Sequence, residues 1–205
     1  MEEKKVIEFN FGKMTLLIIL ICAVFFMISS FFPGIIIYFA FSKKAEWYTI
    51  FTNAFFHSSI VHLGYNMLNL FIFGSIIEVK ENSKFFLFVI FFGILFGNLG
   101  FSLFSNDYSI GLSGGIFGLI GCAMVLFPNQ KVILPLFGIG VLSKIWFAGP
   151  VMACGELLLS FFAEDNIAHS AHFFGFLAGM VIGFARRNKR NMQNIERRQD
   201  SNISN

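Results

Sequence analysis

Long runs without a charged residue constrain this chain more than any other feature. Residues 14–32 and 85–104 contain no charge at all, and an apolar helix of about 20 residues is what crosses the hydrocarbon core of a bilayer. Only 13% of the 205 residues are charged, against about 25% in soluble domains. The sequence therefore predicts an all-α, polytopic membrane protein.

Six membrane spans are expected, and together they form one domain between two terminal segments. The spans are residues 14–32, 58–77, 85–104, 113–127, 145–162 and 168–184. Residues 132–143, interrupted by Pro135 and Gly138, are too short to cross and are expected in the membrane interface. The predicted organisation is a short N-terminus (1–13), a six-helix membrane domain (14–185) and a basic, polar tail (186–205) expected to be disordered.

Six spans place both termini on one side of the membrane. Most Lys and Arg residues then fall on that side, while Lys43 and Lys44 fall on the other. Because cytoplasmic loops are enriched in these cations, both termini are expected to be cytoplasmic. The simplest location is a prokaryotic inner membrane. The cations lie at segment ends rather than in one patch, so no nucleic-acid partner is expected.

Polar residues inside the spans need a reason, because they are costly in lipid. In the second span His62, Asn66 and Asn69 share one helical face. Small residues recur on the fourth span (Ser113, Gly114, Gly118, Gly121) and on the sixth (Gly175, Gly179, Gly183). Such surfaces favour close helix packing, which would bring Ser113 and His172 together near the outer ends of their helices.

This constellation predicts hydrolytic chemistry. A serine hydroxyl becomes a nucleophile when an imidazole removes its proton, and the resulting oxyanion needs donors. Ser113 and His172 are the candidate catalytic pair, and His62, Asn66 and the Ser113 backbone N–H are the candidate oxyanion donors. No aspartate stands where a third member would be expected, so the sequence predicts a dyad that packing or another polar group orients. No metal or cofactor is expected.

Three motifs together resemble the rhomboid family of intramembrane serine proteases. They are His57-x4-His62-x3-Asn66, Gly111-Leu112-Ser113-Gly114 and Ala171-His172-x2-Gly175-x3-Gly179, within residues 46–184. The resemblance implies Ser113 as nucleophile, His172 as general base, and His62 and Asn66 as oxyanion donors. It also implies a six-helix fold around a water-filled cavity, and cleavage of transmembrane protein substrates in the lipid bilayer near their outer ends.

Two positions depart from the family pattern. Tyr48-Thr49 stands where rhomboids often carry Trp-Arg, and Phe174 replaces a glycine after the sixth-span histidine. The first departure bears on contacts of the first loop rather than on the chemistry.

Other functions remain open on the residues alone. The chain could be a catalytically silent rhomboid-like protein that binds membrane clients, although such proteins lack the serine or the histidine. A channel or transporter would need more polar positions along several helices than Glu156 provides. A zinc site of the four histidines (His57, His62, His169, His172) lacks a carboxylate base at the expected spacing. Glu156 is a mid-span carboxylate with no partner identifiable from the sequence.

Overall fold

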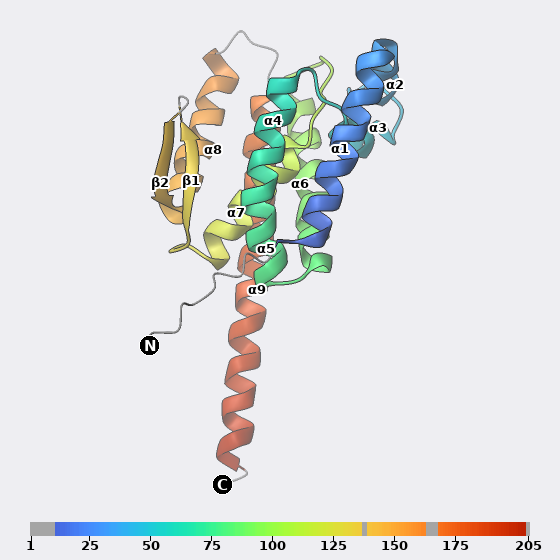
Figure 1. Cartoon of the computed structure of the whole chain (residues 1–205). Helices are drawn as coiled ribbons and strands as arrows, with labels where there is room; N and C mark the ends of the chain where they lie inside the picture. Colours follow the sequence, from blue (N-terminus) through green and yellow to red (C-terminus); the bar gives the residue numbers. More distant parts are fainter. Residues whose placement is uncertain (1–10, 137–138, 163–167, 204–205) are drawn as a thin grey trace, which may run out of the picture.

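The computed structural model describes residues 11–136, 139–162 and 168–203, and most of these residues are helical (Figure 1). The chain begins with α1 (Lys13–Phe31), a 3-10 turn (Pro33–Ile35), α2 (Ile36–Phe39), α3 (Thr49–Thr52) and a second 3-10 turn (Asn53–Phe55). It continues through α4 (Ile60–Asn69), a π turn (Leu70–Gly74), α5 (Ser75–Lys80), α6 (Ser83–Phe104) and α7 (Ser113–Leu126). The strands β1 (Lys131–Leu136) and β2 (Ile139–Lys144) precede α8 (Ile145–Phe162) and α9 (His169–Ile203).

Three helices of the described chain are long and apolar enough to cross a membrane. They are α1, the continuous helix Ile60–Lys80 formed by α4, the π turn and α5, and α6. Large apolar side chains such as Leu20 and Leu103 are well exposed on them, as expected of surfaces that face lipid rather than water. The helices Ser113–Leu126 and Ile145–Leu159 are apolar but shorter.

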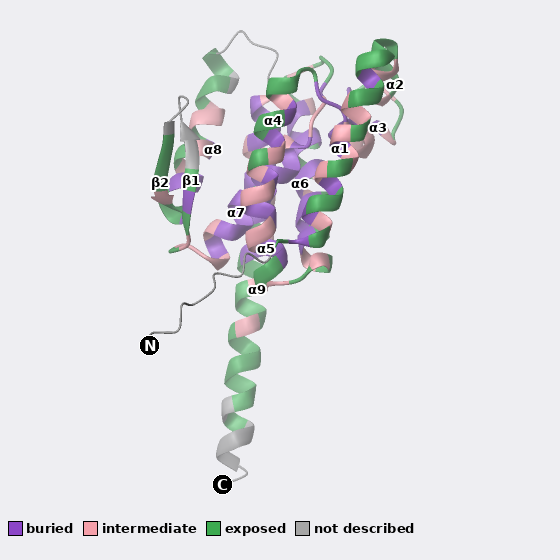
Figure 2. Cartoon of the chain, in the orientation of Figure 1, coloured by how far each residue is buried: buried purple, intermediate pink, exposed green. Residues whose placement is uncertain are grey.

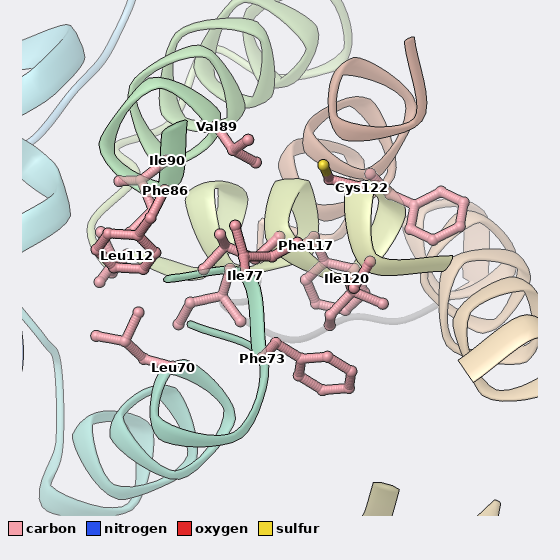
Figure 3. Packing of buried hydrophobic residues seen from close by; sticks show 14 of the residues in the cluster. Leu70, Phe73, Ile77, Phe86, Val89, Ile90, Leu112, Phe117, Ile120 and Cys122 are labelled. Atoms are coloured by element: carbon pink, nitrogen blue, oxygen red, sulfur yellow. The ribbon is translucent and has the colours of Figure 1, made fainter. Parts of the chain in front are cut away.

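Helix α7 lies at the centre of the bundle and is buried along nearly its whole length (Figures 1 and 2). A helix that is apolar on every side is one enclosed by other elements. Figure 3 shows Leu112, which immediately precedes α7, and Phe117 and Ile120 of α7 between side chains of α6 (Phe86, Val89, Ile90) and of the second long helix (Leu70, Phe73, Ile77). Its sides contact protein rather than lipid, so α7 does not need the length of a lipid-facing span.

The predicted glycine surfaces of the fourth and sixth spans do pack against each other. A Cβ atom added to Gly175 would overlap the Gly114 carbonyl group, and one added to Gly179 would overlap that of Gly118. Side chains larger than hydrogen would therefore separate α7 from α9. This backbone-to-backbone packing sets the first turn of α9 beside the first residue of α7.

The Glu78 side chain links the beginning of α1 to the end of α5 through hydrogen bonds. Its carboxylate accepts hydrogen bonds from the backbone N–H groups of Met14 (2.9 Å) and Thr15 (2.8 Å) and from the Thr15 hydroxyl (2.8 Å). The Ser83 hydroxyl donates to it as well, at 2.7 Å. A carboxylate at a helix N-terminus satisfies unpaired N–H groups and complements the helix dipole.

The structure corrects the all-α prediction at residues 131–144. There β1 and β2 form an antiparallel hairpin with Lys131 opposite Lys144 and Leu136 opposite Ile139, and the expected place of this segment in the membrane interface stays a prediction. Strand pairing satisfies backbone groups that an irregular segment beside a membrane would leave unpaired. The hairpin lies beside α8 (Figure 1).

The tail was expected to be disordered, and this prediction is wrong for residues 186–203. Helix α9 continues without a break to Ile203 and projects from the bundle (Figure 1). Arg186 pairs with Glu81 at 2.8 Å, and Arg190 pairs with the same carboxylate. These ion pairs hold the helix at the point where it leaves the bundle. Residues 1–10 of the predicted N-terminal segment lie outside the described residues.

Candidate active site

Ser113 and His172 lie within hydrogen-bond distance, although 59 residues separate them. The Ser113 Oγ is 2.7 Å from Nε2 of His172. Ser113 is the first residue of α7 and His172 lies in the first turn of α9, so the glycine packing of these two helices sets the distance. The Phe117 ring stacks on the imidazole with centroids 4.7 Å apart and planes within 4°, which fixes the plane of the ring.

A carboxylate contacts the other nitrogen of the same imidazole. The Glu156 Oε2 lies 2.7 Å from Nδ1 of His172 and 2.6 Å from Nδ1 of His169. An ionised carboxylate only accepts hydrogen bonds, so both Nδ1 atoms then carry the proton. A neutral His172 ring then has its unprotonated nitrogen, Nε2, facing the serine hydroxyl. The sequence singled out Glu156 as unusual but did not identify this partner, because the register of α8 against α9 leaves no signal in the chain.

These groups open into a cavity of about 840 Å³. Its walls come from α4, α6, the loop before α7, α7 itself, α8 and α9, and they include His62, Asn66, Asn69, Ser113, Glu156, His169 and His172. The three polar residues of the second span thus face one cavity, as their spacing predicts. A space of this size with several polar side chains in its walls can hold water molecules.

His62 lies beside the loop that leads into Ser113. A Cβ atom added to Gly111 would lie 2.8 Å from both Cε1 and Nε2 of His62, and Gly111 has φ +115°. Only glycine fits that conformation and that approach without strain. The Ser58 hydroxyl lies 3.1 Å from Nδ1 of His62, so the opposite ring nitrogen points toward the serine loop.

The side-chain amide of Asn66 does not point freely toward a substrate, as its predicted role as an oxyanion donor would require. Its Nδ2 donates to the His62 carbonyl oxygen of its own helix at 3.0 Å. Its Oδ1 is buried and has no hydrogen-bond partner among the described residues. The Asn66 Nδ2 would therefore have to break its hydrogen bond to the helix backbone before it could donate to a bound substrate.

A pair of buried amides, which the sequence did not predict because its members lie 45 residues apart, holds the loop before Ser113. Asn53 and Asn98 exchange two hydrogen bonds of 3.1 and 3.0 Å. The Asn53 carbonyl oxygen accepts from the Gly111 N–H at 2.9 Å, and the Asn53 side chain donates to the Ser109 carbonyl oxygen at 3.3 Å. The first loop thereby fixes the chain on both sides of Ile110.

His57 takes a supporting position. It is almost completely buried, and its ring centroid lies 5.0 Å from that of His62. Burial, with a smaller contribution from the neighbouring His62, lowers the pKa of His57 from 6.5 to about 3. A neutral imidazole at this place packs behind His62, as expected of a loop anchor.

The four-histidine zinc set considered from the sequence is not assembled. Among the described residues, the group with metal-ligand geometry is Glu156, His169 and His172, without His57 or His62. These three residues supply imidazole nitrogens and a carboxylate oxygen, which are the ligands that Zn²⁺ accepts.

The fold and the site together define a helical protein with a serine–imidazole–carboxylate array at the wall of a cavity. The Rhomboid domain model matches residues 44–189, which is more than half of the chain. The chain therefore belongs to the rhomboid family. Its apolar helices and its family identify it as an integral membrane protein.

The proteins similar to this chain include bacterial members of the family and a mitochondrial member from yeast. The chain is 30% identical over 144 residues to the rhomboid protease GluP of Bacillus subtilis, covering 69% of this chain and 26% of GluP. YdcA of the same organism is 30% identical over 152 residues, covering 69% of this chain and 68% of YdcA. The mitochondrial rhomboid protein 1 of Saccharomyces cerevisiae is 30% identical over 146 residues, covering 66% of this chain and 41% of that protein. The chain thus spans a quarter to two thirds of the length of these relatives.

Proposed function

We propose that this protein is an intramembrane serine endopeptidase that cleaves transmembrane protein substrates in the lipid bilayer. The observation that carries the proposal is the 2.7 Å contact between Ser113 Oγ and His172 Nε2 at the wall of the cavity. A serine placed against an unprotonated imidazole nitrogen can be activated as a nucleophile. Two relatives, GluP and the GlpG protein of Yersinia pestis, are named as rhomboid proteases.

In the first half of the reaction, the Ser113 Oγ attacks the carbonyl carbon of the scissile peptide bond while its proton moves to His172 Nε2. Negative charge develops on the carbonyl oxygen, and the Ser113 N–H, His62 and Asn66 are the proposed donors to it. Collapse of the tetrahedral intermediate breaks the C–N bond. The proton on Nε2 then passes to the leaving amine, and an ester on Ser113 remains.

In the second half, a water molecule from the cavity attacks that ester. His172 takes a proton from the water, and the Ser113 oxygen recovers it when the acyl product leaves. Glu156 accepts from Nδ1 of His172 throughout, so it keeps the ring in the reactive tautomer and stabilises the imidazolium that forms in each half. We therefore assign Glu156 as a positioning residue and extend the predicted dyad by this carboxylate.

The proposed arrangement in the membrane has six spans, with both termini cytoplasmic and the cavity toward the outer face, in a prokaryotic inner membrane. The helix α7 would then be a span enclosed within the bundle, while α8 would expose apolar side chains such as Trp146 and Phe147 to the lipid. No metal or cofactor takes part in the proposed hydrolysis.

Co-reconstitution with a fluorescent transmembrane-helix substrate in liposomes tests this function. We expect wild type to cleave the substrate near its outer end, as located by mass spectrometry, and Ser113→Ala to leave it intact. The alternative, a silent protein that binds clients, predicts that wild type and Ser113→Ala both retain uncleaved substrate. Equal recovery of intact substrate with both proteins would favour that alternative.

A further inference from the structure

We propose that Glu156, His169 and His172 form an inhibitory site for a divalent transition-metal ion of the Zn²⁺ type. Binding at this site follows from the three side chains alone. Its effect on activity rests on the proposed protease function.

The three side chains already converge on a common point. The Glu156 Oε2 lies 2.6 Å from Nδ1 of His169 and 2.7 Å from Nδ1 of His172, and the three ligand atoms lie within 4.8 Å of one another. His169 and His172 are three residues apart in the first turn of α9, so they share a face. Zn–N distances of about 2.1 Å require only a small separation of these groups.

A metal ion can reach the three side chains from the cavity, and it would keep one coordination position for a water molecule. All three residues line the cavity that contains Ser113, and the Glu156 side chain is 20% exposed while the two histidines are nearly buried. Two imidazoles and one carboxylate with a water molecule in the fourth position make a tetrahedral zinc sphere. The carboxylate is the only charge in the set, which favours a cation between the three side chains.

Metal binding at Nδ1 would disable the base on the other side of the ring. A neutral imidazole carries one proton, and without metal this proton lies on Nδ1 of His172, hydrogen-bonded to Glu156. A metal ion needs the Nδ1 lone pair, so the proton must move to Nε2. Nε2 then presents a donor to Ser113 Oγ and cannot accept the serine proton. Metal occupancy and catalysis are therefore mutually exclusive.

Binding is tested on Ser113→Ala protein, which keeps all three ligands and is inactive under any version of the mechanism. The full chain, without a histidine tag and stripped by chelator, is titrated with Zn²⁺ in detergent against a chromophoric zinc chelator. We expect one ion per chain, and an affinity that falls by about tenfold or more when His169→Ala is added. Two substitutions are controls that should keep the affinity. Ser170→Ala changes a cavity residue beside His169, and Cys154→Ser removes an exposed thiol of α8.

Inhibition is tested separately by cleavage with and without Zn²⁺, each variant being compared with its own metal-free rate. Wild type and Ser170→Ala should lose activity over the range in which the ion binds and recover it with EDTA, whereas His169→Ala should need about tenfold more zinc or beyond. Absence of binding to Ser113→Ala protein, or binding unchanged by His169→Ala, would overturn the site. Binding without inhibition of an active wild type would overturn its inhibitory role. If wild type cleaves nothing, the protease function fails and the binding titration still decides the site.

Discussion

The Glu156 carboxylate of α8 contacts Nδ1 of His172 at 2.7 Å, on the side of the ring opposite Ser113. The chain thus places a serine hydroxyl, an imidazole and a carboxylate in line across three helices. The sequence predicted the first two members and an unspecified orienting group. This contact explains how a carboxylate can be retained in the middle of an apolar helix, because it has two imidazole partners and lines the cavity.

Replacing this carboxylate should slow the chemical step. In Glu156→Gln the amide no longer fixes the His172 tautomer or balances the imidazolium, so we expect kcat to fall by about 100-fold with KM little changed. Cys154→Ser, at an exposed position of the same helix, is the matched control and should cleave at the wild-type rate. A wild-type kcat in Glu156→Gln would contradict the positioning role.

The glycine contact between α7 and α9 should tolerate no side chain. In Gly179→Ala the new Cβ meets the Gly118 carbonyl group, which cannot move without shifting α7. We expect a loss of about 1–3 kcal/mol in the free energy of unfolding, together with loss of activity as Ser113 and His172 separate. Gly64→Ala is the control, because no atom lies within 4 Å of its added Cβ, and it should be neutral or stabilising. Reversible unfolding in mixed micelles measures both, and equal stabilities for the two variants would argue against the packing described.

The amide pair Asn53–Asn98 should show strong coupling. Each single alanine substitution leaves a buried amide without its partner, at a cost of about 1–3 kcal/mol. The double variant leaves no orphan of this pair, so its cost should be smaller than the sum by about 1 kcal/mol or more. Unfolding free energies of the four proteins give the coupling directly. Strictly additive costs would show that the two side chains act independently.

Acid should destabilise the protein through His57. Its pKa is about 3 in the folded protein and 6.5 as the ordinary value, so the unfolded chain binds a proton that the folded chain excludes. The stabilisation is complete above pH 6.5 and is lost progressively as the pH falls toward 3, by about 2–3 kcal/mol at pH 4.5.

The comparison of wild type with His57→Gln isolates this effect, because the other titrating groups are common to both proteins. Unfolding measured between pH 7.5 and 4.5 should show a steeper loss of stability for wild type. Parallel profiles would indicate that His57 remains accessible to protons in the folded state.

The sequence predicted most of the helical fold because its signals are local. Uncharged runs mark α1 and α6, and glycines every four residues on the sixth span predict its packing on α7. The spacing of His62, Asn66 and Asn69 likewise predicts a common face. The prediction of six spans in a bilayer stays a prediction, since three helices of the described part of the chain meet the length and composition of a span.

The features that the sequence missed depend on contacts between distant segments. The Glu156–His172 pair depends on the register of α8 against α9. The Asn53–Asn98 pair depends on how the first loop folds over α6. The hairpin at residues 131–144 and the helical tail were also missed. The hairpin depends on the pairing of β1 with β2. The tail is helical because it continues a helix that is already formed in the bundle, whereas a charged segment of this kind is not expected to form a helix alone.

The central claim is an activated serine at Ser113, and labelling with a fluorophosphonate probe tests it most directly. The probe reacts with serine nucleophiles, so wild type in detergent should label, while Ser113→Ala and His172→Ala should not, with unchanged thermal midpoints showing that both variants fold. Absence of labelling in wild type, or equal labelling of Ser113→Ala, would contradict the account.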